Sequence, residues 1–183
     1  GIADGAWFKL TFKFYSDWGL FQTADPTAAN YLSAEVQAAP PLPGQSPSTV
    51  QYLAVRFDQK GHERPYQKAV IVDVIDGYLK AGDRILVRLG DRRGGGPGTR
   101  VQTFLDDDFR FRAYVDPLGT SRFVAVPGDL RLQVVAGPPT ELRLHGPRFA
   151  RPGLPLLFRL VLLDRWGNIV QSPGGRVRVR LVA

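Results

Sequence analysis

Apolar and polar residues alternate along most of this 183-residue chain, and this period of two limits its possible folds more than any other feature. Such alternation is typical of half-buried β-strands, whose successive side chains point to opposite faces. It occurs around residues 8–14, 53–57, 85–89, 109–115, 130–134, 158–162 and 177–181. Twenty glycines and fifteen prolines interrupt the rest, which excludes long helices. Residues 27–38 fit a short helix or, equally well, a strand from Tyr31 onward.

Residues 69–75 are almost continuously apolar and β-branched, which predicts a strand covered on both faces. Three short segments, 58–61, 116–119 and 164–167, begin with Asp and end with Gly. Asp favours the first position of a type I turn and Gly tolerates the left-handed conformation that follows, so we expect a hairpin turn at each. Short strands joined by such turns are typical of an all-β sandwich or barrel, and of these we expect an immunoglobulin-like β-sandwich.

Proline-rich segments suggest how the chain is divided. Residues 39–48 hold too many prolines to pair inside a sheet, so we expect an exposed loop there. Residues 137–140, Gly-Pro-Pro-Thr, have the composition of a domain boundary. We therefore expect residues 1–136 to form an immunoglobulin-like β-sandwich and residues 137–183 a short or truncated second β module, because a piece this small is close to the roughly 40-residue limit for independent folding.

The charge balance is basic, with 24 Lys and Arg against 17 Asp and Glu and a formal net charge of +7. The arginines fall mostly at every second position or in loops, and no nucleic-acid-binding module accompanies them, so we expect no nucleic-acid partner. No apolar run reaches the roughly 18 residues of a membrane helix, and we expect no membrane partner. The first residues, Gly-Ile-Ala-Asp, lack a signal peptide and an initiator Met, which favours a piece of a longer polypeptide.

Few residues have the spacing that metal binding or catalysis needs. The absence of Cys excludes disulfides, thiolate metal sites and cysteine nucleophiles. Asp106–Asp108 lacks the Asp-x-Asp-x-Asp-Gly spacing of a calcium loop, so we expect a polar turn. His62 and His145 have no nearby ligands and are expected at the surface. We expect no metal, no cofactor and no catalytic residue, since the Gly-x-Ser-x-Gly and Ser-x-x-Lys motifs are also absent.

Residues 90–100 are rich in Gly and Arg, as in a loop that binds phosphate. The segment lacks a Gly-Lys-Ser/Thr ending, and strand patterning rather than a helix follows it, so we expect a flexible hairpin loop. Arg92, Arg93 and Arg100 remain candidates for pairing with an acidic ligand or another domain.

Aromatic residues are scattered along the chain and fit either a core or a sugar-binding platform. The candidates are Trp7, Tyr15, Trp18, Tyr31 and Trp166. Trp166 lies within an expected hairpin turn, so we expect it to be the most exposed of them.

Two resemblances can be stated from these segments. Residues 160–170, with Asp164, Gly167 and Asn168, resemble the strand and turn of bacterial invasin-type immunoglobulin-like domains, in which Asp-x-x-Gly-Asn closes a hairpin. Residues 23–31, 81–85, 89–92 and 98–104 resemble the N-terminal region of a bacterial family of unknown function, whose longer members carry a PHP-like metal-dependent hydrolase domain. This resemblance implies a non-catalytic front region, and no catalytic residue is carried over because the His-rich metal motif has no counterpart here.

We therefore expect a non-catalytic structural or interaction module rather than an enzyme. Its partner would be a downstream domain of the same polypeptide or another protein. The alternative is a carbohydrate- or acidic-ligand-binding module that uses Trp166 or the arginines Arg92, Arg93 and Arg100.

Overall fold

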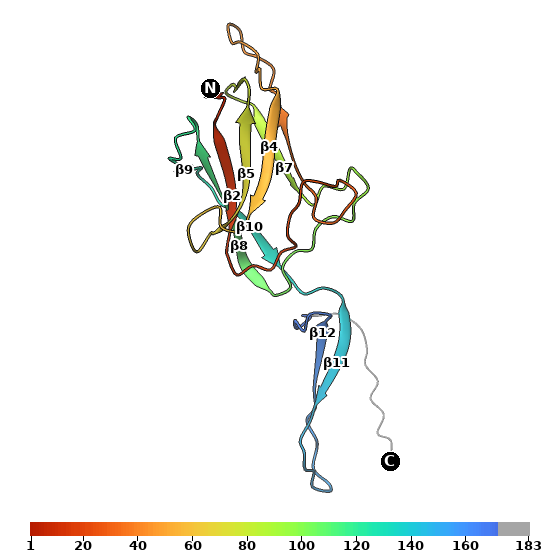
Figure 1. Cartoon of the computed structure of the whole chain (residues 1–183). Helices are drawn as coiled ribbons and strands as arrows, with labels where there is room; N and C mark the ends of the chain where they lie inside the picture. The colour runs from red at the N-terminus through yellow and green to blue at the C-terminus, as the bar shows by residue number, and fades with distance from the viewer. Residues whose placement is uncertain (172–183) are drawn as a thin grey trace. The chain divides into compact units, whose positions relative to one another are not determined.

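The computed structural model describes residues 1–171, and this part of the chain is all β, as the alternation predicts (Figure 1). Its twelve strands are β1 (Ile2–Ala3), β2 (Trp7–Phe12), β3 (Leu32–Gln37), β4 (Tyr52–Asp58), β5 (Lys68–Ile75), β6 (Tyr78–Leu79), β7 (Arg84–Leu89), β8 (Asp106–Asp116), β9 (Val124–Ala125), β10 (Leu130–Val134), β11 (Pro139–His145) and β12 (Arg159–Asp164). The expected strand at 177–181 lies outside the described residues.

The chain divides into two compact units. The first holds Gly1–Gln102 and Asp108–Leu132, and the second holds Thr103–Asp107 and the chain from Gln133 onward.

The largest sheet has the order β10–β8–β2–β5–β4, with the short strand β9 paired to β8. β5 lies between β2 and β4 and is antiparallel to both, so that Val70 is opposite Leu10 on one side and Phe57 on the other. Residues Ala69–Val72 and Val74 are buried, which confirms the prediction of a strand covered on both faces for most of 69–75, whereas Ile75 at its end is exposed.

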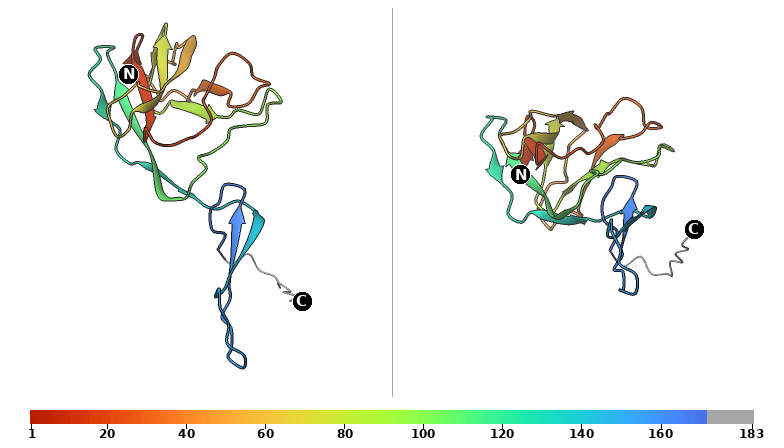
Figure 2. Two further views of the ribbon diagram at one scale, coloured as in Figure 1. Left: turned by 60° about the horizontal axis from the view of Figure 1, so that its bottom comes forward. Right: turned by 90° about the horizontal axis from the view of Figure 1, so that it is seen from below.

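β3 and β7 form an antiparallel ribbon that packs against the large sheet (Figure 2). The apolar contact joins Ala34, Val36, Ile85 and Val87 of the ribbon to a buried cluster of Ala6, Leu53, Val72, Val74 and Leu79. Two layers around one apolar core make a β-sandwich, as the strand pattern predicts. The ambiguous segment 27–38 is a strand rather than a helix, because alternate residues of β3 fill this core.

Aromatic side chains form a second part of the core, at the end of β2. Phe12 is almost fully buried, and the members of this aromatic cluster are Phe12, Trp18, Phe21, Phe57, Phe109 and Phe111. Trp18 is therefore a core residue, its ring 5.4 Å from that of Phe109. Phe109 and Phe111 reach the cluster together because they are two residues apart on β8 and share one face.

Two of the three expected Asp-to-Gly turns form as predicted. The Asp116 carboxylate accepts the Leu118 amide at 3.2 Å, and Gly119 has a φ of 68°. In the Asp164 turn, Gly167 has a φ of 84°. The segment after Asp58 also begins a hairpin, because β4 and β5 are antiparallel neighbours and the Asp58 carboxylate accepts the Lys60 amide at 2.7 Å. It differs from the other two in that Gly61 has no positive φ and the loop runs through residues 59–67.

The proline-rich segment 39–48 forms no strand, as expected, and a buried ion pair ties it to the sandwich. The Lys80 ammonium pairs with the Asp83 carboxylate and donates to the carbonyl of Ala39. Asp83 in turn accepts the Ala39 amide at 2.9 Å and the Ser48 hydroxyl. Both charged side chains are almost completely buried, so this pair fixes the two ends of the loop.

The described part of the second unit contains the β11–β12 hairpin and the turn that follows it. The strands are antiparallel, with Leu142 opposite Leu162 and Leu144 opposite Leu160. Asp164 holds the turn, since its carboxylate accepts the amides of Gly137, Trp166 and Asn168 at 2.8–3.0 Å.

Candidate functional site

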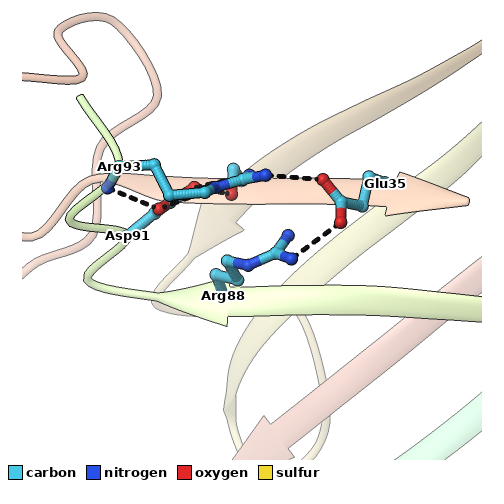
Figure 3. Close-up of polar contacts among 5 residues, drawn as sticks. Glu35, Arg88, Asp91 and Arg93 are labelled. Atoms are coloured by element: carbon cyan, nitrogen blue, oxygen red, sulfur yellow. Dashed lines mark hydrogen bonds and ion pairs between the residues drawn. The ribbon is translucent and has the colours of Figure 1, made fainter.

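Arg93, one of the expected ligand-binding residues, is held in an ion-pair network on the outer side of the β3–β7 ribbon (Figure 3). Its guanidinium pairs with Asp91 at 2.8 Å and with Glu35 at 2.8 Å. The other Glu35 oxygen accepts a hydrogen bond from Arg88 at 2.7 Å, and the Ser33 hydroxyl donates to Asp91 at 2.6 Å. Two carboxylates thus neutralise two guanidinium groups.

The electrostatics of this network favour the charged forms. Hydrogen bonds from Arg93 and Ser33 hold the pKa of Asp91 well below its ordinary value. Hydrogen bonds from Arg88 and Arg93 likewise lower the pKa of Glu35, and the same pairing raises the pKa of Arg93. Because the carboxylates already occupy its donors, Arg93 is poorly placed to bind an added anion.

The hairpin expected at residues 90–100 does not form. This segment joins β7 to β8, which belong to different sheets, and backbone hydrogen bonds tie it to the segment around residue 30. The Asp91 amide donates to the carbonyl of Tyr31 at 2.8 Å, and the Asn30 amide donates to the carbonyl of Gly98 at 2.8 Å. Arg100 pairs with Asp17 at 3.3 Å. Arg92 is exposed, and within residues 1–171 its guanidinium forms no hydrogen bond or ion pair, although its backbone carbonyl accepts the Gly95 amide at 2.9 Å.

Trp166 is half-exposed, as its expected place in a turn predicts, while Trp18 is buried. Its backbone amide donates to Asp164, and the Arg165 guanidinium lies 4.4 Å from the centre of its ring. Trp166 belongs to the second unit and the three loop arginines belong to the first.

The acidic and histidine candidates have local roles. Asp106–Asp108 begins strand β8, so the prediction of a polar turn is wrong. Asp108 instead forms ion pairs with Arg110 and Arg131. The centre of the His62 ring lies 4.4 Å from that of Tyr114, and burial lowers the pKa of His62. Within the described residues, no group of three or more His, Cys, Asp or Glu side chains could hold a metal ion.

Sequence reasoning missed an apolar surface on the second unit. Directly opposed residues of antiparallel strands share a face, so Leu142, Leu144, Leu160 and Leu162 form one side of the hairpin, here called the leucine face. The first three are exposed and Leu162 is half-buried. The spacing Leu142-x-Leu144 and Leu160-x-Leu162 is visible in the sequence and predicts half-buried strands. The spacing does not show whether another element covers the apolar face of these strands.

The loop between β11 and β12, residues 146–158, is the second feature that was missed, and is here called the tip loop. It exposes five large apolar side chains, more than any other loop of the described chain. They are Phe149, Leu154, Leu156, Leu157 and Phe158.

Net charge is distributed unevenly between the two parts of the sequence. Residues 1–141 hold 16 basic and 16 acidic residues, whereas residues 142–183 hold eight Arg and a single Asp. The whole formal charge of +7 therefore comes from the last 42 residues. Counting charge by segment rather than over the chain would have found this asymmetry.

Comparison with known proteins gives no family: no family model, no curated protein and no solved structure matches this chain. Among the described residues, no helix is long and apolar enough to cross a membrane.

Proposed function

We propose that this chain is a non-catalytic interaction module whose leucine face docks on another protein domain, either downstream in the same polypeptide or in a separate protein. We also assign the sandwich of the first unit to the immunoglobulin-like type. The observation that carries the docking proposal is the exposure of Leu142, Leu144 and Leu160 on one side of the β11–β12 hairpin. Contiguous exposed apolar surface of this kind marks interaction sites, because each leucine gains free energy when it leaves water.

The distribution of polar groups also supports this proposal. In the first unit, Arg88, Arg93 and Arg100 are paired with carboxylates, and Lys80 is buried with Asp83. These charges hold loops onto the sandwich rather than converge on a pocket. Such an arrangement is typical of a rigid scaffold, and it supports a role in positioning or binding rather than in chemistry.

Site-specific photo-crosslinking in cells that make the full-length protein tests the docking surface. A benzoylphenylalanine placed at Leu142 should form crosslinks to one defined peptide, within the same polypeptide or in a second protein. The matched control is the same group at Leu118, an exposed leucine in a loop of the first unit. Crosslinking from position 142 should fall when Leu144 and Leu160 are replaced by Ser. The proposal is refuted if positions 142 and 118 give the same products, or if the Ser variant crosslinks as strongly as the parent.

The ligand-binding alternative has less support, because Arg93 and Arg100 are already paired. It stays a prediction for Arg92 and for Trp166, which is 49% exposed and the most exposed of the three tryptophans. Titration of tryptophan fluorescence with glycans, with Trp166→Phe as the control, distinguishes this function from docking.

A further inference from the structure

The tip loop ends in a turn, at the far end of the β11–β12 hairpin (Figure 2). The Leu154 amide donates to the carbonyl of Arg151 at 3.3 Å, and Gly153 has a φ of 79°. The sequence Arg-Pro-Gly-Leu at 151–154 matches a type II turn, with Pro second and Gly third. The side chains on either side of this turn are therefore held at the end of the hairpin.

These side chains are among the most exposed apolar residues of the described chain. Phe149 is 90% exposed and Leu157 is 89% exposed. Leu154 and Leu156 lie between them and are exposed as well. Soluble domains rarely leave several large apolar residues this open on one loop unless the loop binds something.

The charge around these residues has one sign. Between Glu141 and Asp164 the chain carries four Arg and no acidic residue. Arg148 and Arg151 are within the tip loop and Arg159 directly follows it; none of the three forms an ion pair within residues 1–171. By contrast, the arginines on the outer surface of the first unit are largely paired with carboxylates.

We propose that the tip loop binds anionic lipid bilayers, with Phe149, Leu154 and Leu157 entering the interface between headgroups and acyl chains and Arg148, Arg151 and Arg159 contacting lipid phosphates. Membrane-surface segments combine apolar residues that enter the interface with Lys or Arg that attract anionic lipid. This site is separate from the leucine face, and it replaces the expectation of no membrane partner, which rested on the lack of a spanning segment.

The apolar residues favour a lipid over a nucleic acid as the source of the phosphates. Nucleic acids offer phosphate charge and base faces that stack on aromatic rings, but nothing that receives Leu154, Leu156 and Leu157. A bilayer offers phosphates and, directly beneath them, an apolar layer. The combination of aliphatic and cationic side chains on one loop therefore fits a bilayer.

Vesicle flotation with the whole chain tests the proposal. The chain should float with phosphatidylcholine vesicles that contain about 30% phosphatidylserine and stay in solution with pure phosphatidylcholine. Two variants probe the loop: F149S/L157S should bind at least about 10-fold more weakly, and R148Q/R151Q should lose about 5-fold for each arginine removed. The matched controls are L42S/L118S and R92Q, which change exposed residues of the first unit and should bind like the parent. Equal thermal unfolding of all variants shows that they fold.

Insertion is measured separately with an environment-sensitive dye. The chain has no Cys, so Leu157→Cys provides a single attachment point for a nitrobenzoxadiazole label. Its emission should shift to the blue with phosphatidylserine vesicles, whereas the same label at Leu118→Cys should not respond. The proposal is overturned if the chain does not float with phosphatidylserine vesicles, or if the F149S/L157S variant floats as well as the parent. It is also overturned if the chain binds a DNA oligonucleotide more tightly than it binds these vesicles and F149S/L157S does not weaken the binding to DNA.

Discussion

Replacing Phe12 with Ala removes the ring on which the aromatic cluster of the first unit is centred. Phe12 is 1% exposed, and the centroids of five other rings lie 5.5–6.4 Å from its own. Four of the five neighbours are buried and Phe57 is half-buried. They come from β4, β8 and the loop after β2, so they have little freedom to collapse into the space. We therefore expect the loss that is typical of a Phe-to-Ala change in a core, about 3–5 kcal/mol in the free energy of unfolding.

This loss converts into a shift of the melting temperature. Unfolding entropy is about 2.1 cal/mol/K per residue, which for a unit of roughly 127 residues gives about 0.27 kcal/mol/K. The expected fall in Tm is therefore about 11–19 °C.

Urea and thermal unfolding, followed by tryptophan fluorescence, measure the effect, since Trp18 is itself part of the cluster. The matched control is Phe149→Ala, which removes the same ring from a position 90% exposed and should change the free energy by less than about 0.5 kcal/mol. A Phe12→Ala variant within about 1 kcal/mol of the parent would refute the assignment of this cluster as close-packed core.

Two further predictions concern buried carboxylates. Asp83→Asn leaves the buried Lys80 ammonium without its partner and should lower the free energy of unfolding by about 3–5 kcal/mol in urea titrations. The double variant K80M/D83L removes both charges and should recover most of this loss. An Asp83→Asn protein as stable as the parent would contradict the pairing. Burial raises the pKa of Asp164, but hydrogen bonds from Asn168 and from backbone amides outweigh it and lower the pKa to about 2. Since this lies below the unfolded value, the stabilisation is complete above about pH 4 and is lost as the pH falls through about 2. NMR titration of the Trp166 and Asn168 amides checks this, and a midpoint near pH 4 would be inconsistent with it.

The strands of the first unit were largely predictable because they depend on local patterns. The apolar run at 69–75 became the central strand β5, and the alternation at 109–115 became β8, because in each case burial follows the period of the sequence. The helix-or-strand ambiguity of residues 27–38 could not be resolved locally. It was decided by β7, whose residues pair with β3 and are far from it in the sequence.

The candidate site was less predictable, because long-range ion pairs determine which charges are available. Arg93 looked open to a ligand, yet Glu35, 58 residues earlier, occupies its guanidinium. Asp108 looked like part of a turn, yet Arg131 on β10 and Arg110 on its own strand keep it within β8. The exposure of the leucine face could not be predicted either. A sequence pattern shows which residues share a face of a strand, but not whether another part of the protein covers that face.

The β11–β12 hairpin also bears on how the protein avoids aggregation. Among the described residues, the outer edge of β12 is paired only near its end, by the bridge between Leu163 and Ile169, and no strand pairs with the outer edge of β11. An apolar ribbon with open edges is a template for pairing between chains. Pro139 at the start of β11, Pro147 and Pro155 in the tip loop, and Arg143 and Arg159 on the face opposite the leucines all disfavour such stacking. The same arginines and prolines that flank the apolar residues thus act as gatekeepers that keep an open ribbon in solution.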